Sequence, residues 1–381
     1  MMFFISLIMG GFISWRAIFT TKFKLPIKIL LTLIVFIIFN KFKILRHLGG
    51  AYFAPDVSAA TLLWSAHFYV TMLMFFLLLL CSEIIILLVK VIFKKVNLTS
   101  SFLNKIRLAE FILAIGLAIF GIYNGLAAPR VREIVIYSEK IPSNVKSVRL
   151  ALLSDLHIDR VNDSKHIQRV IDITNAQSAD YILLTGDLID GRTKKHYETL
   201  SLLGNLKAKY KTFAVSGNHE YYAGNFDKIV DSLKKSNIIY LSNTSVLEEK
   251  INVRFCGIPD KKAATPRKTT KVIPSIPLAV KDSKTTEYKI LLSHDPKTAY
   301  QAAKHGIDLQ VSGHTHGGMF WGLDILVGLM NKGFSFGTYF VGNLRLEITN
   351  GACLWSGFPV RIGHPSEIVM INLLPSSRLK K

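Results

Sequence analysis

Cysteine is scarce in this chain of 381 residues, and the few cysteines form no recognisable pattern. The three present, Cys81, Cys256 and Cys353, lie far apart and make no CxxC pair. Their spacing excludes a disulfide framework and a zinc finger, and it leaves the redox compartment open. Internal repeats and low-complexity tracts are also missing from the sequence, which excludes a repeat array.

Acidic residues are also few, with 26 Asp and Glu against 47 Lys and Arg, for a formal net charge of +21. Aromatic side chains are not interleaved with the basic ones, so we expect no nucleic-acid partner. Part of the surplus lies between hydrophobic runs, where basic residues anchor helices at lipid headgroups. A denser basic stretch from Lys261 to Lys289 is either a solvated surface or a region that attracts anionic lipid or a phosphorylated substrate.

Long hydrophobic runs dominate the chain up to residue 128. A helix needs about 20 apolar residues to cross a bilayer. We predict that residues 1–128 form a transmembrane region of about four spans, within Phe3–Ile13, Ile29–Asn40, Ala60–Val89 and Phe111–Ala128, the first two of which are short. The expected partner is the lipid bilayer of the cell (inner) membrane. Basic residues in the loops place the later part of the chain outside the cytoplasm, although Arg130 and Arg132 argue for the opposite side.

Short apolar runs alternate with helical patterns after residue 148. We predict a linker with a short strand over residues 129–147, an α/β domain over 148–375 and a basic tail over 376–381. Polar clusters follow the apolar runs, as in open α/β sheets, where sites lie at the carboxyl ends of strands. The alternation alone would also allow a single doubly wound sheet.

Five polar clusters occur in order along this domain. They are Asp155-Leu156-His157, Gly186-Asp187, Gly217-Asn218-His219-Glu220, Ser293-His294-Asp295 and Gly313-His314-Thr315-His316. Each alone has a structural explanation, because an Asp at a strand end can cap a helix and a single histidine can belong to the core. Together, the carboxylates, amide and imidazoles are the side chains that hold two neighbouring divalent metals, and such a pair drives phosphate-ester hydrolysis.

The order and spacing of these clusters resemble the calcineurin-like metallophosphoesterases, in particular the membrane-anchored bacterial branch of YkuE-like and YaeI-like phosphohydrolases. The resemblance covers about residues 130–375, and it includes the closing pattern Trp355…Pro359-Val-Arg361…Glu367. It implies a four-layer α/β/β/α sandwich, preceded here by a bundle of transmembrane helices. Met319 and Ser356-Gly357 depart from the family pattern at positions that bear on substrate rather than on metal binding.

The resemblance also implies roles for individual residues. One metal would be held by Asp155, His157 and His316, and the other by Asn218, His294 and His314, with Asp187 bridging both. Mn, Fe, Zn and Mg are all compatible with these ligands. A hydroxide between the metals would attack phosphorus in line, and a cationic His219 would protonate the leaving oxygen or stabilise the phosphoryl charge. Asp190 would orient that histidine, unless it serves only a local turn or cap.

The sequence therefore predicts a membrane-anchored, metal-dependent hydrolase of a phosphoester or pyrophosphate. The substrate would be a phosphorylated small molecule or a lipid, such as the nucleotide-linked acyl sugar UDP-diacylglucosamine; the oligomeric state is not predicted. Two alternatives are a membrane transporter, for which Glu83 and His67 would be the polar residues of interest, and a metal-binding scaffold without turnover. An intact His219 beside a full ligand set argues against the scaffold.

Overall fold

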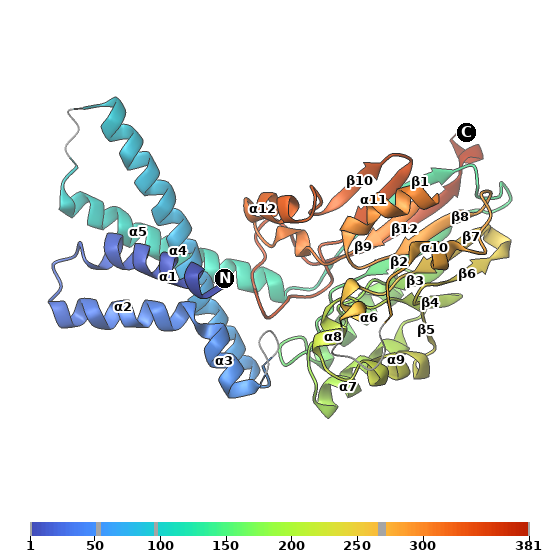
Figure 1. Cartoon of the computed structure of the whole chain (residues 1–381), viewed down its shortest axis with the longest axis horizontal. Helices are drawn as coiled ribbons and strands as arrows, with labels where there is room; N and C mark the ends of the chain where they lie inside the picture. Colours follow the sequence, from blue (N-terminus) through green and yellow to red (C-terminus); the bar gives the residue numbers. More distant parts are fainter. Residues whose placement is uncertain (1, 51–54, 95–97, 266–271, 380–381) are drawn as a thin grey trace. The chain divides into compact units, whose positions relative to one another are not determined.

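The computed structural model describes residues 2–50, 55–94, 98–265 and 272–379, and the chain divides into two compact units (Figure 1). The helical unit comprises Met1–Asn124 together with Ser356–Val360. The α/β unit comprises Gly125–Trp355 together with Arg361–Lys381.

Among its described residues, the helical unit contains two helices that are long and apolar enough to cross a membrane, α4 and α5. A third candidate exists if α2 and α3, which are bent by 61° at their junction, count as one span, whereas the apolar helix at Phe4–Ile18 is shorter. The count of four spans stays a prediction. The helices are α1 (Met2–Ile13), the π-helix η1 (Ser14–Ile18), α2 (Leu25–Phe39), α3 (Lys41–Gly49), α4 (Ala59–Ile92) and α5 (Ser100–Leu126).

Glu83, the carboxylate within the long apolar run, is paired inside the helical unit. It forms ion pairs with Arg16 and with Arg107, the second at 2.9 Å between Oε1 and Nη2. A charge at membrane depth is costly unless another charge compensates it. Helix packing by this ion pair therefore accounts for Glu83 without a transport pathway.

The α/β unit is built on two six-stranded sheets of mixed direction. The first has the order β1 (Arg130–Ser138), β12 (Glu367–Pro375), β2 (Val148–Leu153), β3 (Tyr181–Leu184), β4 (Lys211–Ala214) and β5 (Ile238–Tyr240). The second has the order β10 (Gly337–Val341), β11 (Leu344–Ile348), β9 (Leu309–Ser312), β8 (Tyr288–Leu292), β7 (Val253–Gly257) and β6 (Thr244–Glu248).

Helices cover the outer faces of both sheets, and the two inner faces pack on each other (Figure 1). This arrangement confirms the four-layer α/β/β/α sandwich. The helices of the unit are α6 (Ser164–Ala176), α7 (Lys194–Ser201), α8 (His219–Tyr222), α9 (Phe226–Lys235), α10 (Ile276–Val280), α11 (Ala299–Ala302) and α12 (Leu323–Met330), with short 3-10 turns between them.

Strand β2 shows why these strands are continuous apolar runs. Leu150 and Leu152 enter the core between the sheets, whereas Ala151 and Leu153 pack against the helical layer on the other side. All four side chains are fully buried. A strand that is covered on both faces has no reason to alternate polar with apolar residues.

Strand β1 is longer than the short strand, Glu133–Tyr137, that the sequence predicts within a linker. It pairs in parallel with β12 along its whole length, from Arg130 opposite Glu367 to Ser138 opposite Pro375. The stretch 129–147 therefore contributes a full edge strand to the first sheet. The expected basic tail begins with a 3-10 turn at Ser376–Arg378, and its last two lysines lie outside the described residues.

Candidate metal centre

Parallel pairing collects the polar clusters at one edge of the sandwich. Strands β2, β3, β4 and β5 are mutually parallel, and so are β7, β8 and β9. The loops that follow the carboxyl ends of these strands therefore meet, as is usual for sites in α/β sheets. These loops carry Asp155, Asp187, Asn218, His294, His314 and His316.

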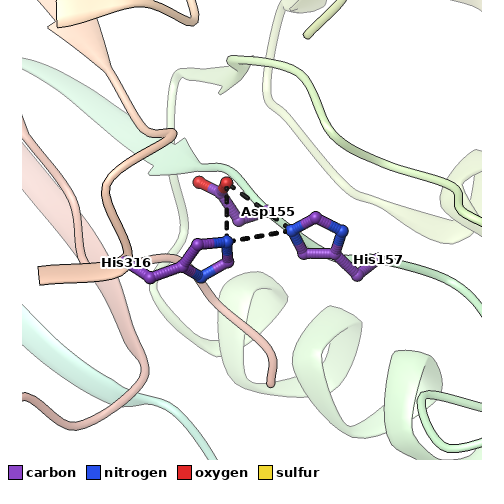
Figure 2. Close-up of side chains that lie close together, drawn as sticks. All are labelled: Asp155, His157 and His316. Carbon is purple, nitrogen blue, oxygen red and sulfur yellow. Dashed lines mark hydrogen bonds and ion pairs between the residues drawn. The ribbon is translucent and has the colours of Figure 1, made fainter. Parts of the chain in front are cut away.

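Three donors converge in the first group, Asp155, His157 and His316 (Figure 2). The Nε2 atoms of the two histidines lie 3.0 Å apart. They lie 3.7 Å and 3.4 Å, respectively, from Oδ1 of Asp155. A carboxylate and two imidazoles that point at one position form a suitable ligand set for a transition-metal ion.

A second group is formed by Asp187, His294 and His314. Nε2 of His294 lies 3.0 Å from Oδ2 of Asp187 and 3.2 Å from Nδ1 of His314. Asp187 also belongs to a group with His157 and His219, so it lies between the two clusters. That position fits the bridging role that the resemblance implies.

Asn218 supports a metal at this place through an unsatisfied oxygen. Its Oδ1 atom is buried and has no hydrogen-bond partner among the described residues. A buried acceptor of that kind is normally satisfied. A cation is a suitable partner, because the amide oxygen ligates a metal without adding negative charge. The donor set as a whole therefore fits divalent metal ions.

The backbone of the ligand loops is held in an unusual conformation. Five of the seven expected ligands have a positive φ: Asp155 at 56°, His157 at 44°, Asp187 at 52°, His314 at 75° and His316 at 51°. Residues with side chains rarely adopt this region, and such strain gathers at functional sites. Here it aims successive side chains at a shared centre.

Two glycines allow the ligand loops to approach one another. A Cβ at Gly217 would lie 2.2 Å from Oδ1 of Asp187, and a Cβ at Gly313 would lie 2.2 Å from Oδ2 of Asp155. Both positions require the absence of a side chain. The glycines of these motifs therefore have a steric role in the centre.

His219 lies beside the two donor groups and contacts Asp190. Its Nδ1 is 2.6 Å from Oδ1 of Asp190, and its Nε2 is 3.9 Å from Oδ2 of Asp187. Burial alone would lower the pKa of His219, but the charges of Asp190 and Asp187 raise it above the usual value. The arrangement favours a protonated imidazole at the edge of the centre.

Asp190 has a second contact that the sequence did not reveal. The same Oδ1 atom accepts a hydrogen bond from Nδ1 of His157 at 2.9 Å, which turns Nε2 of that ring toward Asp155 and His316. His294 is oriented similarly, because its Nδ1 donates to the carbonyl oxygen of Thr185 at 2.8 Å. Partners of this kind fix the tautomer of a metal-ligating histidine.

The two carboxyl groups expected to bind metal remain ionised in this surrounding. Burial alone would raise the pKa of Asp187, but the imidazoles of His294 and His219 hold it well below its usual range. The pKa of Asp155 is also lowered, since His316 and His157 outweigh the effect of burial. Both carboxylates are therefore anionic and able to bind cations.

Two further residues support the centre, and the sequence reasoning gave neither a role. The carboxylate of Glu220 accepts the backbone N–H groups of Asp187, Leu188 and Gly217 at 3.1, 2.6 and 2.7 Å, which ties two ligand loops together. The sequence signal that could have identified Glu220 is its position directly after His219.

Arg361 is the second supporting residue, and it is fully buried. It donates to the carbonyl oxygens of His316 and Cys353 at 2.7 and 3.0 Å, and its Nη2 lies 3.2 Å from Nδ1 of His316. The closing sequence pattern contains this arginine, but no local signal links it to a residue 45 positions earlier.

Comparisons with known proteins agree with this geometry. A model of the calcineurin-like phosphoesterase family matches residues 148–318. An uncharacterized metallophosphoesterase of Helicobacter pylori (strain J99) is 34% identical over 277 residues, which cover 72% of each chain. The chain belongs to the calcineurin-like metallophosphoesterases. The family and the assignment as a metal-dependent phosphoester hydrolase are thus confirmed.

Two further relatives of the chain match it over different shares of their own length. The uncharacterized metallophosphoesterase YkuE of Bacillus subtilis is 26% identical over 258 residues, covering 63% of this chain and 84% of that protein. A transmembrane protein with metallophosphoesterase domain from Danio rerio is 31% identical over 273 residues, covering 70% of this chain and 62% of that protein.

Proposed function

We propose that this metallophosphoesterase is anchored in a membrane by its apolar helices and uses two divalent ions to hydrolyse a phosphoester or pyrophosphate. The main support is the pair of donor groups on either side of Asp187, together with the His219–Asp190 contact at their edge. Asp155, His157 and His316 would hold one ion. Asn218, His294 and His314 would hold the other.

The residues around the ions have distinct tasks. Bound divalent ions offset phosphoryl charge and make a nucleophile accessible at neutral pH. His219 donates a proton to the leaving oxygen, or a hydrogen bond to a phosphoryl oxygen, from its Nε2 atom. Asp190 holds the opposite ring nitrogen, so that the proton on Nε2 points into the centre.

Basic side chains near the centre favour an anionic substrate. Lys261 is exposed and pairs with Asp295, the residue after His294, at 2.9 Å. Nζ of Lys262 lies 5.5 Å from the ring centre of Tyr222, which in turn contacts His219. Lys289 of the same basic stretch is buried, and residues 266–271 lie outside the described residues.

The substrate that fits best is a lipid phosphate or a lipid-linked pyrophosphate, with UDP-diacylglucosamine as a specific candidate. The two apolar helices α4 and α5 would keep the hydrolase at a bilayer, where such molecules are found. A soluble phosphoester is the competing substrate. The metal centre would attack the phosphorus atom in the same way whether the substrate is soluble or carried by a lipid.

Hydrolysis by the full chain in detergent tests the proposal. We expect metal-dependent turnover of bis(p-nitrophenyl) phosphate that Asp187→Ala abolishes and that His219→Ala lowers strongly to a measurable residual rate, while His305→Ala, a histidine outside the donor groups, leaves it unchanged. A panel of lipid phosphates, UDP-diacylglucosamine and soluble nucleotides then identifies the substrate class. Equal rates for wild type and both site variants would refute catalysis and favour the scaffold; activity on soluble nucleotides alone would refute the lipid substrate.

A further inference from the structure

Helix α12 exposes an apolar surface that no other part of the α/β unit covers among the described residues. We define the apolar ridge as Trp321, Ile325, Leu326, Leu329 and Met330, whose side chains are 69%, 68%, 53%, 74% and 69% exposed. Gly328 is the one buried residue of the helix. An exposed patch of this kind on a folded domain indicates a surface that a partner or a membrane covers.

The apolar ridge is attached directly to the metal centre. Gly318 lies two residues after His316, and a Cβ at Gly318 would lie 2.2 Å from Cα of Asp324 in the first turn of α12. Trp321 is fixed against Gly363, where an added Cβ would lie 2.1 Å from the indole nitrogen. The ridge is therefore held at the edge of the sandwich that carries the ligands.

The last two residues of α5, Gly125 and Leu126, are part of the α/β unit. Gly125 belongs to this unit, and a Cβ there would lie 2.4 Å from Cδ1 of Leu354. Trp355, the next residue, stacks on His316 with ring centres 6.0 Å apart. Through Leu354 and Trp355, the first residues of the α/β unit therefore lie near the edge that carries the expected ligands.

The charges beside the ridge fit a lipid surface. Asp324 and Lys332 are the formal charges in residues 321–332. Asp324 accepts the backbone N–H of Gly322 at 2.7 Å and lies 3.7 Å from His364, whereas Lys332 is exposed at the end of the helix. Exposed apolar side chains with an aromatic residue and a flanking cation are typical of helices that lie in a membrane interface.

We propose that the apolar ridge inserts into the boundary between headgroups and acyl chains of the bilayer that anchors the protein. Insertion would hold the metal centre at the lipid surface and present a membrane phosphoester to it from the side. The docking rests on the proposed membrane anchoring but not on catalysis, and only its consequence for the substrate depends on the hydrolase activity.

Depth-dependent quenching in the full chain tests the docking. The chain is reconstituted in nanodiscs of phosphatidylethanolamine and phosphatidylglycerol, with an environment-sensitive NBD label on one cysteine. Native Cys81, exposed in α4, reports the anchoring. Leu326→Cys in a Cys81→Ala background reports the ridge. The matched control is Lys207→Cys, because Lys207 is exposed and precedes β4, at the amino ends of the strands and away from the metal centre.

We expect lipids with a shallow doxyl group to quench the label at positions 81 and 326 at least twofold, and to leave position 207 unchanged. Quenching at 81 without quenching at 326 would overturn the docking while preserving the anchoring. A blue-shifted emission at 326 that lipid doxyl groups do not quench would mean that protein covers the ridge, and it would also overturn the proposal.

Activity provides a second and independent readout. Leu326→Gln combined with Leu329→Gln should lower turnover of a vesicle-borne phosphatidic acid at least fivefold and leave turnover of bis(p-nitrophenyl) phosphate unchanged. Leu278→Gln, an exposed apolar residue of α10, should change neither rate. Equal loss on both substrates would show that the ridge serves folding instead. If wild type hydrolyses neither substrate, the proposed function fails, and quenching still decides the docking.

Discussion

Asp190 offers the sharpest test of how the centre is supported, because one carboxylate oxygen serves two histidines. Its Oδ1 atom lies 2.9 Å from Nδ1 of His157 and 2.6 Å from Nδ1 of His219. Its Oδ2 atom is buried without a hydrogen-bond partner among the residues described. Asp190→Asn can therefore place its amide nitrogen at the Oδ2 position and keep an oxygen toward both rings.

The size of the effect follows from the loss of charge. A hydrogen bond to a charged group contributes about 1.5–3 kcal/mol, whereas a neutral one contributes about 0.5–1.5 kcal/mol. Two weakened bonds therefore cost about 2 kcal/mol. Since about 1.4 kcal/mol corresponds to a factor of ten, we expect a loss of roughly 30-fold, within the range known for partners of metal ligands.

Metal-titrated kinetics can divide this loss between the two histidines. The share through His157 should appear as a higher metal concentration for half-maximal activity, and the share through His219 as a lower kcat at saturating metal. In a His219→Ala background, Asp190→Asn should then raise the metal requirement but leave the residual kcat unchanged. A change of less than twofold in both quantities, or a full kcat loss in that background, would refute the shared-oxygen role.

Three further substitutions test other parts of the structure. Arg361→Lys keeps the charge but loses the planar contacts to His316, so the metal affinity measured by calorimetry should fall at least tenfold; unchanged affinity would contradict its role. Glu220→Gln replaces an acceptor of backbone N–H groups by a donor, and the free energy of unfolding in urea should fall by about 1–3 kcal/mol, with no change as the contrary result. Phe213→Ala empties part of the core between the sheets and should lower the same free energy by about 3–5 kcal/mol, whereas exposed Tyr210→Ala should change it by no more than about 0.5 kcal/mol.

The convergence of the polar clusters could be predicted from sequence because each cluster follows a short apolar strand. Parallel strands place their carboxyl ends together, so Asp155 and Asp187 had to meet whichever sheet was formed. The sequence alone did not distinguish one sheet from two, because the passage from β5 in the first sheet to β6 in the second has no local signature. The family resemblance supplied that distinction.

Long-range partners were beyond the reach of local patterns. Arg130 lies opposite Glu367 in the register of β1 and β12. This strand pairing makes an edge strand of residues that the sequence predicts as a linker. The contact between Arg361 and His316 is likewise absent from any local pattern. It exists because the fold buries the two distant residues beside each other. The exposure of α12 was equally hidden, since an apolar helix in a sequence normally indicates a core element.

The central claim is that one set of donors holds two divalent ions around Asp187. Elemental analysis of protein purified without chelators tests it most directly. We expect close to two equivalents of divalent metal per wild-type chain and a clear loss in Asp187→Ala, with activity lost on chelation and restored by the same metal. A wild-type chain that contains no metal and gains none on incubation would show that these residues form no dinuclear centre.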